Sequence, residues 1–318
     1  EHDFFCHRGE LQLYKGSMSN EQKNIMLNPL SQNTGNDNPD AILIQHALDG
    51  NRKSLEQLVA DHQPWIYNIA FKMIMDHDDA ADITQEILIK IITNLASYNP
   101  DRGNFRTWAY RIVVNHVLNM KKRKFETRIY DFDRYIAAIE NFPDDSSFTH
   151  PDAGLLAEEV KTGCMMGMLL CLKRTERIAF LWGAVFAVSD AVGSELMDIS
   201  RENFRQLLSR SRRKVFNYMN GTCGHMNPAN KCRCSHKVKS FLDLGMLDSA
   251  ILRYHRPNSR MVKDMLGSRL ERFHLSYYEP FLALFREQPF YDPPDVTSWL
   301  DDILRQEDLK AIFNLGEE

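Results

Sequence analysis

The sequence has no long apolar run, few cysteines and none of the common enzyme motifs. No stretch of about 18 apolar residues occurs, so no membrane-spanning helix is predicted. No charged start followed by an apolar stretch and a small-residue cleavage site opens the chain, which predicts a cytoplasmic protein. Its 6 cysteines among 318 residues are too few for a disulfide scaffold. Without a glycine-rich phosphate loop, a His-Glu-x-x-His sequence or a nucleophile motif, no catalytic residue and no enzyme are predicted.

Alternating strand patterns are missing as well, and apolar residues recur instead at helical spacing. The predicted fold class is therefore all-α, with two small helical domains joined by a linker and followed by a helical extension. The predicted segments are a disordered leader (1–40), a first domain (41–125), a linker (126–157), a second domain (158–219), a cysteine-rich loop (220–238) and an acidic C-terminal extension (239–318).

Several helices and their boundaries follow from this pattern. Pro64 lies inside the first long apolar stripe and predicts a kink or a break there. Asn104 is placed to cap a helix that runs through Trp108 and Leu118. In the second domain, helices are predicted over 155–172, 175–187, 190–197 and 200–219.

The net charge of −4 hides a strong segregation of charge along the chain. Residues 102–128 contain 8 Lys or Arg and 1 acid, and residues 201–214 contain 6 and 1. These two basic patches suit a nucleic acid, although a single basic run is more often a solvated surface. Acids gather instead between Asp76 and Glu86 and again from Glu287 to Glu318, where 9 acids accompany 2 bases.

Residues 189–214 have the pattern of a helix-turn-helix. Asp198 occupies the turn, where Asp tolerates a left-handed backbone, and Ser200 is placed to cap the second helix. Four apolar residues are predicted to pack the two helices together: Leu196, Ile199, Phe204 and Leu208. Base edges would be met near the helix start by Ser200, Arg201, Asn203, Arg205 and Gln206, and phosphates by Arg210, Arg212, Arg213 and Lys214. An ordinary helical hairpin with a solvated basic face is the alternative.

Two motifs carry a resemblance to a known family. Asp82-Ile-Thr-Gln-Glu86 fits the pattern Asp-x-x-Gln-Glu, and Gly103-Asn-Phe-Arg-Thr-Trp-Ala-Tyr-Arg111 with Asn115 fits Gly-x-Phe-x-x-Trp-x-x-x-Ile-x-x-Asn. Through them, residues 41–125 resemble the second conserved region of bacterial RNA polymerase sigma factors of the extracytoplasmic-function (ECF) group. Residues 172–216 resemble the fourth region of the same family through Leu172, Arg177, Phe180, Ile199-Ser200 and Leu208 to Arg212.

Asp82, Gln85 and Glu86 form what we call the acidic ridge. Their i, i+3, i+4 spacing places them on one helix face, opposite the apolar stripe, where they suit a basic partner helix. The resemblance implies that this partner is the clamp coiled coil of core RNA polymerase. Acids that only favour the helix dipole are the alternative reading.

The resemblance further implies how promoter DNA would be opened. The loop 99–104, which ends at Asn104, would capture a base flipped from the minus-ten element. Phosphates would be held by Arg106, Arg111, Lys121, Lys122, Arg123 and Lys124, while Phe105 and Trp108 fall on the core stripe. The helix-turn-helix would read the minus-thirty-five element as duplex. Promoter DNA, core polymerase and an anti-sigma factor are therefore the predicted partners, and no membrane is involved.

Two features depart from the family or extend it. Gly193 replaces the usual bulky apolar residue, which predicts poorer packing and a loss of about 1 kcal/mol of helix propensity. After the second basic patch, Cys223, His225, Cys232 and Cys234 offer candidate zinc ligands, although Cys-x-Cys is tighter than the usual knuckle spacing. No cofactor is required by the prediction. A thiol switch and purely structural cysteines are the other readings of this loop.

Two other functions compete with a polymerase subunit. A free-standing helix-turn-helix regulator has the same basic patches but no need of the acidic ridge. A metal-dependent enzyme centred on the cysteine loop would need a carboxylate base, which the loop does not supply. For the acidic extension, we predict that it folds back on the DNA-binding surfaces by charge attraction, with a merely solubilising role as the alternative.

Overall fold

The computed structural model describes residues 39–123, 126–127, 131–254, 260–261, 279–306, 309 and 313. In these residues the ordered structure is helical, apart from the antiparallel pair β1 (Arg260–Met261) and β2 (Pro289–Phe290) and a bridge between Cys223 and Cys232. The all-α prediction is thereby confirmed. The predicted leader lies outside the described residues as far as residue 38. None of the described helices combines the length and apolar character that a membrane crossing requires.

The first group of helices surrounds a long central helix. Its members are α2 (Pro39–Leu48), α3 (Arg52–Ile74), α4 (His77–Thr93), the short turns η1 (Leu95–Ser97) and η2 (Pro100–Arg102), and α5 (Phe105–Asn119). Pro64 was predicted to kink or break the helix, and α3 continues through it without a break. Almost every residue from His62 to Ile74 is buried, so packing on all sides outweighs the roughly 3 kcal/mol that an internal proline costs.

A second group follows along the chain. It contains α6 (Phe132–Asn141), α7 (Ala153–Leu170), α8 (Arg174–Phe180), the π-helical turn η3 (Leu181–Val185), α9 (Asp190–Met197), α10 (Arg201–Thr222) and α11 (Cys234–Asp243). Helix α6 lies within the segment predicted as a linker, and Asp131 caps it by accepting a hydrogen bond from the Arg134 amide. The helix predicted over 175–187 is divided between α8 and η3.

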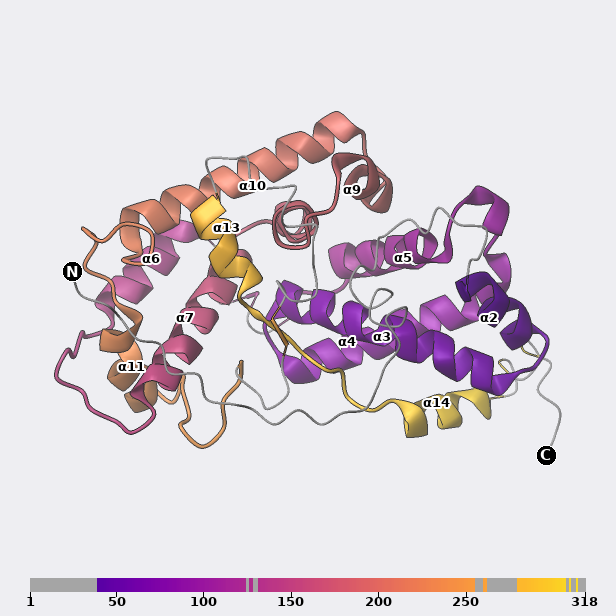
Figure 1. Ribbon diagram of the computed structural model, residues 1–318, viewed down its shortest axis with the longest axis horizontal. Helices are drawn as coiled ribbons and strands as arrows, with labels where there is room; N and C mark the ends of the chain where they lie inside the picture. Colours follow the sequence, from indigo (N-terminus) through magenta and orange to yellow (C-terminus); the bar gives the residue numbers. More distant parts are fainter. Residues whose placement is uncertain are drawn as a thin grey trace, which may run out of the picture.

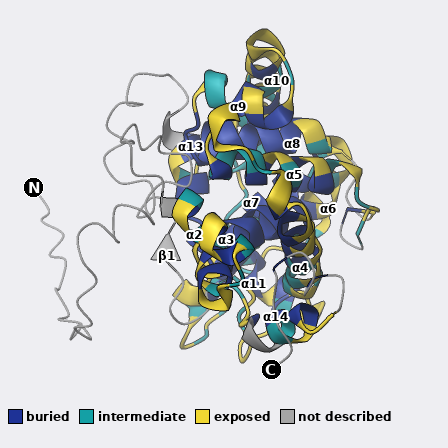
Figure 2. Cartoon of the chain, turned by 90° about the vertical axis from the view of Figure 1, so that its right-hand side faces the viewer, coloured by how far each residue is buried: buried dark blue, intermediate teal, exposed yellow. Residues whose placement is uncertain are grey.

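The C-terminal segment crosses both groups. After α13 (Glu279–Arg286) the chain passes through β2 and along α3 to α14 (Thr297–Leu304), as the yellow ribbon in Figure 1 shows. The largest buried side chains, among them Phe71, Tyr110 and Trp182, belong to one continuous core that joins the two groups. Buried residues accordingly lie between the helices in Figure 2, and exposed residues cover their outer sides.

Candidate nucleic-acid interface

Helices α9 and α10 are joined by the turn that the sequence predicted. Asp198 adopts a left-handed backbone with φ 51° and ψ 48°, which confirms the assignment of the turn. Ser200 caps α10 by accepting a hydrogen bond from the Asn203 amide at 3.2 Å. Leu196 and Phe204 are buried between the helices, and Ile199 packs at the margin of the core.

Gly193 improves the packing of this unit instead of weakening it. A Cβ atom at this position would lie 2.3 Å from Cζ of Phe204, closer than carbon atoms approach without a clash. The ring of Phe204 is fully buried against α9 because glycine leaves room for it. The expectation of poorer packing is therefore wrong: the bulk that the family places on α9 is supplied here from α10.

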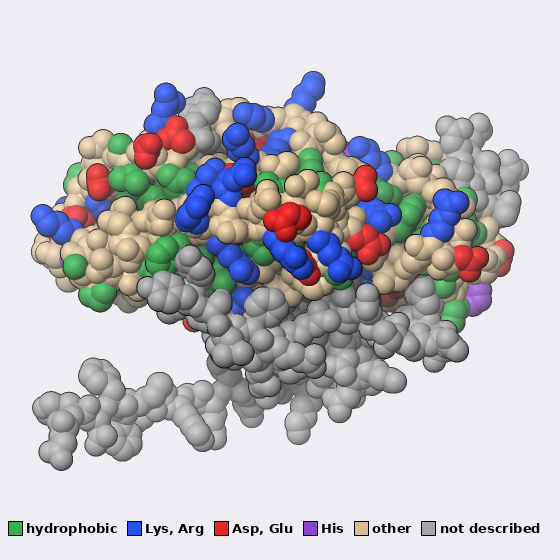
Figure 3. Space-filling view, turned by 90° about the horizontal axis from the view of Figure 1, so that it is seen from above, with side chains coloured by type: hydrophobic (Ala, Val, Ile, Leu, Met, Phe, Trp, Pro, Cys, Tyr) green, Lys and Arg blue, Asp and Glu red, His purple; other side chains and the backbone are tan. Residues whose placement is uncertain are grey.

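The start of α10 presents the predicted base-reading residues to solvent. Arg201, Asn203, Arg205 and Gln206 are all exposed. Arg205 forms an ion pair with Asp190 of α9, and Gln206 donates to Glu202 at 3.1 Å, so these two side chains are held by their neighbours. Figure 3 shows the molecule from above, where α10 lies in Figure 1. Lys and Arg side chains gather on this face.

The predicted phosphate contacts further along α10 differ in their surroundings. Arg210 and Arg213 are exposed. Arg212 is half-buried and donates to the carbonyl of Gly183 at 3.1 Å, which attaches α10 to η3. Lys214 binds the buried carboxylate of Glu176 at 2.8 Å. The exposed arginines are thus placed to meet a ligand, whereas Arg212 and Lys214 hold the fold together.

On the other basic patch, α5 begins at a hollow of about 190 Å³ that residues of the 97–104 loop line. Asn104 caps α5 by accepting from the Thr107 amide at 2.8 Å, as predicted. Gly103 has φ 140°, a conformation that favours glycine, and its carbonyl accepts from the Tyr98 hydroxyl at 3.0 Å. Trp108 and Arg111 also line this hollow, so a polar loop is held open beside an aromatic wall.

The two arginines of α5 point to different partners. Arg106 is only 15% exposed and pairs with Asp40 of α2 at 3.4 Å, so it is turned into the molecule and away from the surface. Burial alone would raise the pKa of Asp40, but His62 and Arg106 hold it below its usual value. Arg111 is exposed and donates to the main-chain carbonyl of Glu195 at 3.2 Å and to its carboxylate at 3.4 Å.

The acidic ridge lies on α4 as predicted, but its last member is engaged within the molecule. Asp82 is exposed and Gln85 is half-buried. Glu86 binds His116 at 3.1 Å and Arg123 at 3.4 Å, and Arg123 also reaches Asp79 at 3.3 Å. Arg123 therefore joins the basic cluster to the ridge.

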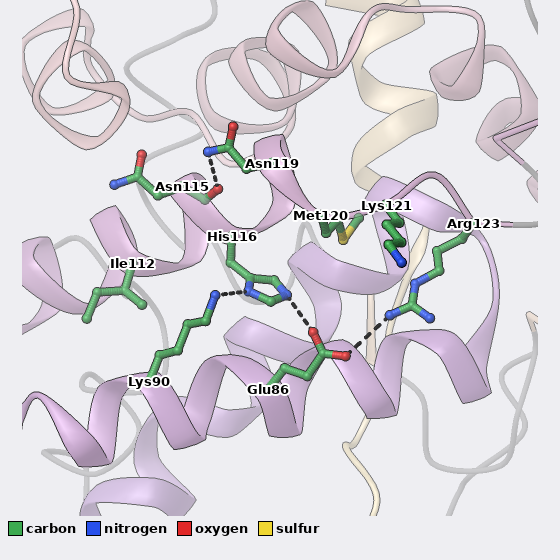
Figure 4. Close-up of a pocket in the computed structure, with 9 residues that line it drawn as sticks. All are labelled: Glu86, Lys90, Ile112, Asn115, His116, Asn119, Met120, Lys121 and Arg123. Atoms are coloured by element: carbon green, nitrogen blue, oxygen red, sulfur yellow. Dashed lines mark hydrogen bonds and ion pairs between the residues drawn. The ribbon is translucent and has the colours of Figure 1, made fainter.

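Figure 4 shows the open pocket of about 540 Å³ beside this network. The chain of contacts runs from Lys90 through His116 to Glu86 and on to Arg123. Burial and the nearby Lys90 lower the pKa of His116 below its usual value. Lys121 and Lys122 are exposed at the end of α5, and Lys124 lies outside the described residues.

Two candidate zinc ligands of the cysteine loop lie on neighbouring segments of the chain. Cys223 and Cys232 face each other across the isolated bridge, where the Gly224 amide donates to the Cys232 carbonyl at 3.2 Å. His225 is exposed, and burial raises the pKa of Cys234. Within the described residues, no three Cys, His, Asp or Glu side chains are arranged to hold a metal ion. Zinc at this loop stays a prediction.

A buried carboxylate that the sequence reasoning did not single out connects the two groups of helices. Glu126 accepts from Arg174 at 2.9 Å and from Arg177 at 3.0 Å. Arg177 is itself buried and donates to the carbonyls of Leu169 and Met73. Burial alone would raise the pKa of Glu126, but the two arginines lower it. In the sequence, Glu126 stood out only as the single acid inside a basic run.

The geometry defines an all-α protein with a helix-turn-helix and a second basic helix that begins at a polar hollow. Residues 58–126 match the Sigma-70 region 2 family, so this part of the chain is similar to a region 2 domain. The match covers α4, α5, the acidic ridge and every residue that lines the hollow except Glu195.

Similarity to individual proteins centres on part of the chain. This chain is 33% identical over 92 residues to the ECF RNA polymerase sigma factor SigE of Mycolicibacterium smegmatis, and the match covers 28% of this chain and 35% of SigE. RNA polymerase sigma-H factor of Pseudomonas aeruginosa is 27% identical over 114 residues, covering 36% of this chain and 51% of its own length. SigW of Bacillus subtilis is 28% identical over 97 residues, covering 30% and 50%. The chain thus spans about a third to a half of these relatives.

A solved structure of CnrH in complex with the cytosolic domain of CnrY matches 57% of this chain and 97% of that chain. The sequence identity is 20% and the TM-score is 0.42.

Proposed function

We propose that this protein is a transcription initiation factor that binds core RNA polymerase, recognises promoter elements and assists DNA melting, with no catalytic step of its own. The observation that carries the proposal is the match of residues 58–126 to Sigma-70 region 2, which coincides with the exposed ridge on α4 and the hollow before α5. A free-standing regulator has no use for that ridge.

Core polymerase would be bound by the exposed part of the acidic ridge. Asp82 is exposed and Gln85 is half-buried on α4, whereas Glu86 is already engaged by His116 and Arg123. Asp82 is therefore the ridge carboxylate that is best placed to meet a basic helix of another protein.

Melting would take place at the hollow before α5. A flipped base needs a polar pocket and a flat side chain against which to stack. The hollow offers the amide of Asn104 beside Trp108, while Phe105 is buried in the core. Arg111, Lys121 and Lys122 would hold the phosphates of the separated strand.

The helix-turn-helix would read the minus-thirty-five element as duplex DNA. Arg201 and Asn203 stand exposed at the start of α10, where a recognition helix meets base edges in the major groove. Arg210 and Arg213 lie further along the same helix and would contact the phosphates.

Binding to core polymerase tests the proposal directly. Asp82→Lys is expected to reduce co-purification with core enzyme at least about ten-fold, because it places a cation against a basic partner. Asp133→Lys is the matched control, since Asp133 is an exposed acid in the first turn of α6. Equal recovery of both variants would contradict the ridge assignment. Failure of the unaltered protein to bind core enzyme while it still binds DNA would favour a free-standing regulator.

A further inference from the structure

The C-terminal segment 279–304 attaches its two halves to different parts of the molecule. Its first half, α13, packs on the second group of helices: Phe285 contacts Phe180 of α8 with ring centroids 5.1 Å apart, and Phe281 contacts Phe216 of α10 at 5.8 Å. Arg286 donates to the carbonyl of Ala184 in η3 at 3.2 Å. Phe281 and Phe285 are fully buried, so α13 contributes to the core around the helix-turn-helix.

The second half of the segment lies along α3. Phe290 packs on Trp65 at 4.8 Å, and Tyr291 packs on Phe71 at 4.7 Å. Asn68 is completely buried and exchanges two hydrogen bonds with the main chain of Tyr291, at 2.7 and 2.8 Å.

Two further polar side chains of α3 donate to this part of the segment. Gln63 donates to the Pro294 carbonyl at 2.7 Å, and Lys72 donates to the Pro289 carbonyl at 3.3 Å. The sequence predicted a charge contact between the acidic tail and the basic patches. These contacts are made instead by aromatic rings and main-chain groups.

By joining α13 to α10 and β2 to α3, the segment favours the arrangement in which α9 lies against α5. In that arrangement Arg111, which faces the hollow, is bound to Glu195 of α9, and Glu195 itself lines the hollow. The minus-ten and minus-thirty-five elements are about 25 base pairs apart, roughly 85 Å at 3.4 Å per base pair. The first group of helices would bind one element and the helix-turn-helix the other. While the two are in contact they cannot occupy both elements at once, so the structure is a closed state.

The contact between the two groups of helices contains buried polar atoms that favour its opening. The hydroxyl of Tyr110 in α5 and the indole nitrogen of Trp182 in η3 are buried without a hydrogen-bond partner among the described residues. Their rings meet edge to face at 5.4 Å. Unmade buried hydrogen bonds destabilise a contact, and water satisfies these groups once the contact opens.

We propose that residues 279–304 are an intramolecular clasp that holds α9 against α5 and so keeps the chain from engaging promoter DNA until the segment is displaced. The regulatory meaning rests on the proposed function, but the clasp itself is a statement about conformation. The bonds of Arg174 and Arg177 to Glu126 also tie α8 to the end of the first group of helices.

Hydrogen exchange in the full-length chain measures opening without DNA or polymerase. Phe281→Ala with Phe285→Ala is expected to speed amide exchange in α9 and at the start of α5 about ten-fold or more, while exchange in α4 is unchanged. Ala283→Ser is the matched control, because Ala283 is exposed on the same helix. Unchanged exchange in α9 and α5 would overturn the clasp, and so would equal acceleration everywhere, which reports global unfolding.

A second variant weakens the other half of the segment and does not truncate an aromatic ring. Gln63→Leu removes the hydrogen bond to the Pro294 carbonyl, so exchange in α9 is expected to speed and DNA affinity to rise a few-fold. Unchanged exchange in this variant would also overturn the clasp. If α9 and α5 open in the phenylalanine variant while DNA affinity stays the same, the clasp stands, and the assignment of α5 as a DNA surface fails.

Discussion

Arg111 of α5 binds both the main-chain carbonyl and the carboxylate of Glu195 in α9. One exposed guanidinium therefore connects the helix that would meet the separated strand to the helix that supports duplex recognition. Because both side chains are about half exposed, water screens their pairing, and the ion pair contributes at most about 1 kcal/mol.

Removal of the carboxylate is expected to loosen Arg111 and make it more available to DNA, although the hydrogen bond to the main-chain carbonyl of Glu195 remains. Glu195→Gln should raise affinity for promoter DNA by up to about five-fold in fluorescence anisotropy, with the larger gain at low salt. Glu202→Gln removes a carboxylate of the same charge that bonds to Gln206 instead. A gain of equal size in both variants would mean that only net charge matters.

Specific and general contacts on α10 are expected to separate in binding assays. Arg201→Ala should cost about 1–3 kcal/mol at a cognate site and little on scrambled DNA, because Arg201 stands at the helix start. Arg213→Ala should weaken both DNAs alike and reduce the salt dependence. Identical losses on both DNAs for both variants would remove base reading from the start of α10.

The contact of Gly193 with Phe204 predicts a destabilising glycine substitution. Gly193→Ala should lower the free energy of unfolding by about 1–3 kcal/mol, because the new methyl group overlaps the ring. Gly154→Ala in α7 is the control, since a Cβ there meets no atom within 4 Å and should leave stability unchanged or raised. Denaturant titration compares the two, and equal stability would show that Phe204 moves aside without cost.

Lys72 makes the stability of the fold depend on pH. Burial lowers its pKa from 10.5 to about 7, so the folded chain releases this proton at a pH where the unfolded chain still binds it. Stability is therefore expected to rise with pH between about 7 and 10 through this group, and the destabilisation is complete below pH 7.

Thermal unfolding of Lys72→Met tests this dependence. The variant should be more stable than the unaltered protein by an amount that is largest near pH 7 and shrinks toward pH 9. Lys53→Met, an exposed lysine of the same helix, should show no such trend. A difference that stays constant with pH would assign the gain to packing alone.

Sequence reasoning predicted the features that depend on neighbouring residues. Asp198 in the turn, the caps at Asn104 and Ser200, and the helical exposure of Arg201 all follow from local backbone chemistry. The acidic ridge was also placed on one face of α4, because helical spacing alone determines which residues share a face.

Features that depend on distant residues were not predictable in this way. Glu126 pairs with Arg177, 51 positions later, and Asn68 bonds to Tyr291, 223 positions later. Gly193 seemed a defect because periodicity describes one helix at a time, whereas the ring that fills its space comes from the next helix. Arg106 and Glu86 were assigned to outside partners by the family resemblance and by helical spacing, but each has an internal partner of opposite charge.

Two side chains of α3 donate hydrogen bonds to main-chain carbonyls of the C-terminal segment. Both carbonyls belong to prolines, Pro289 and Pro294. A proline offers an acceptor without a donor, so no amide hydrogen is left unsatisfied where Gln63 and Lys72 supply only donors. Recognition of this stretch through its main chain tolerates changes in side chains that point away from α3. The segment is thus free to diverge at those positions while its shape and the carbonyls of Pro289 and Pro294 keep it in place.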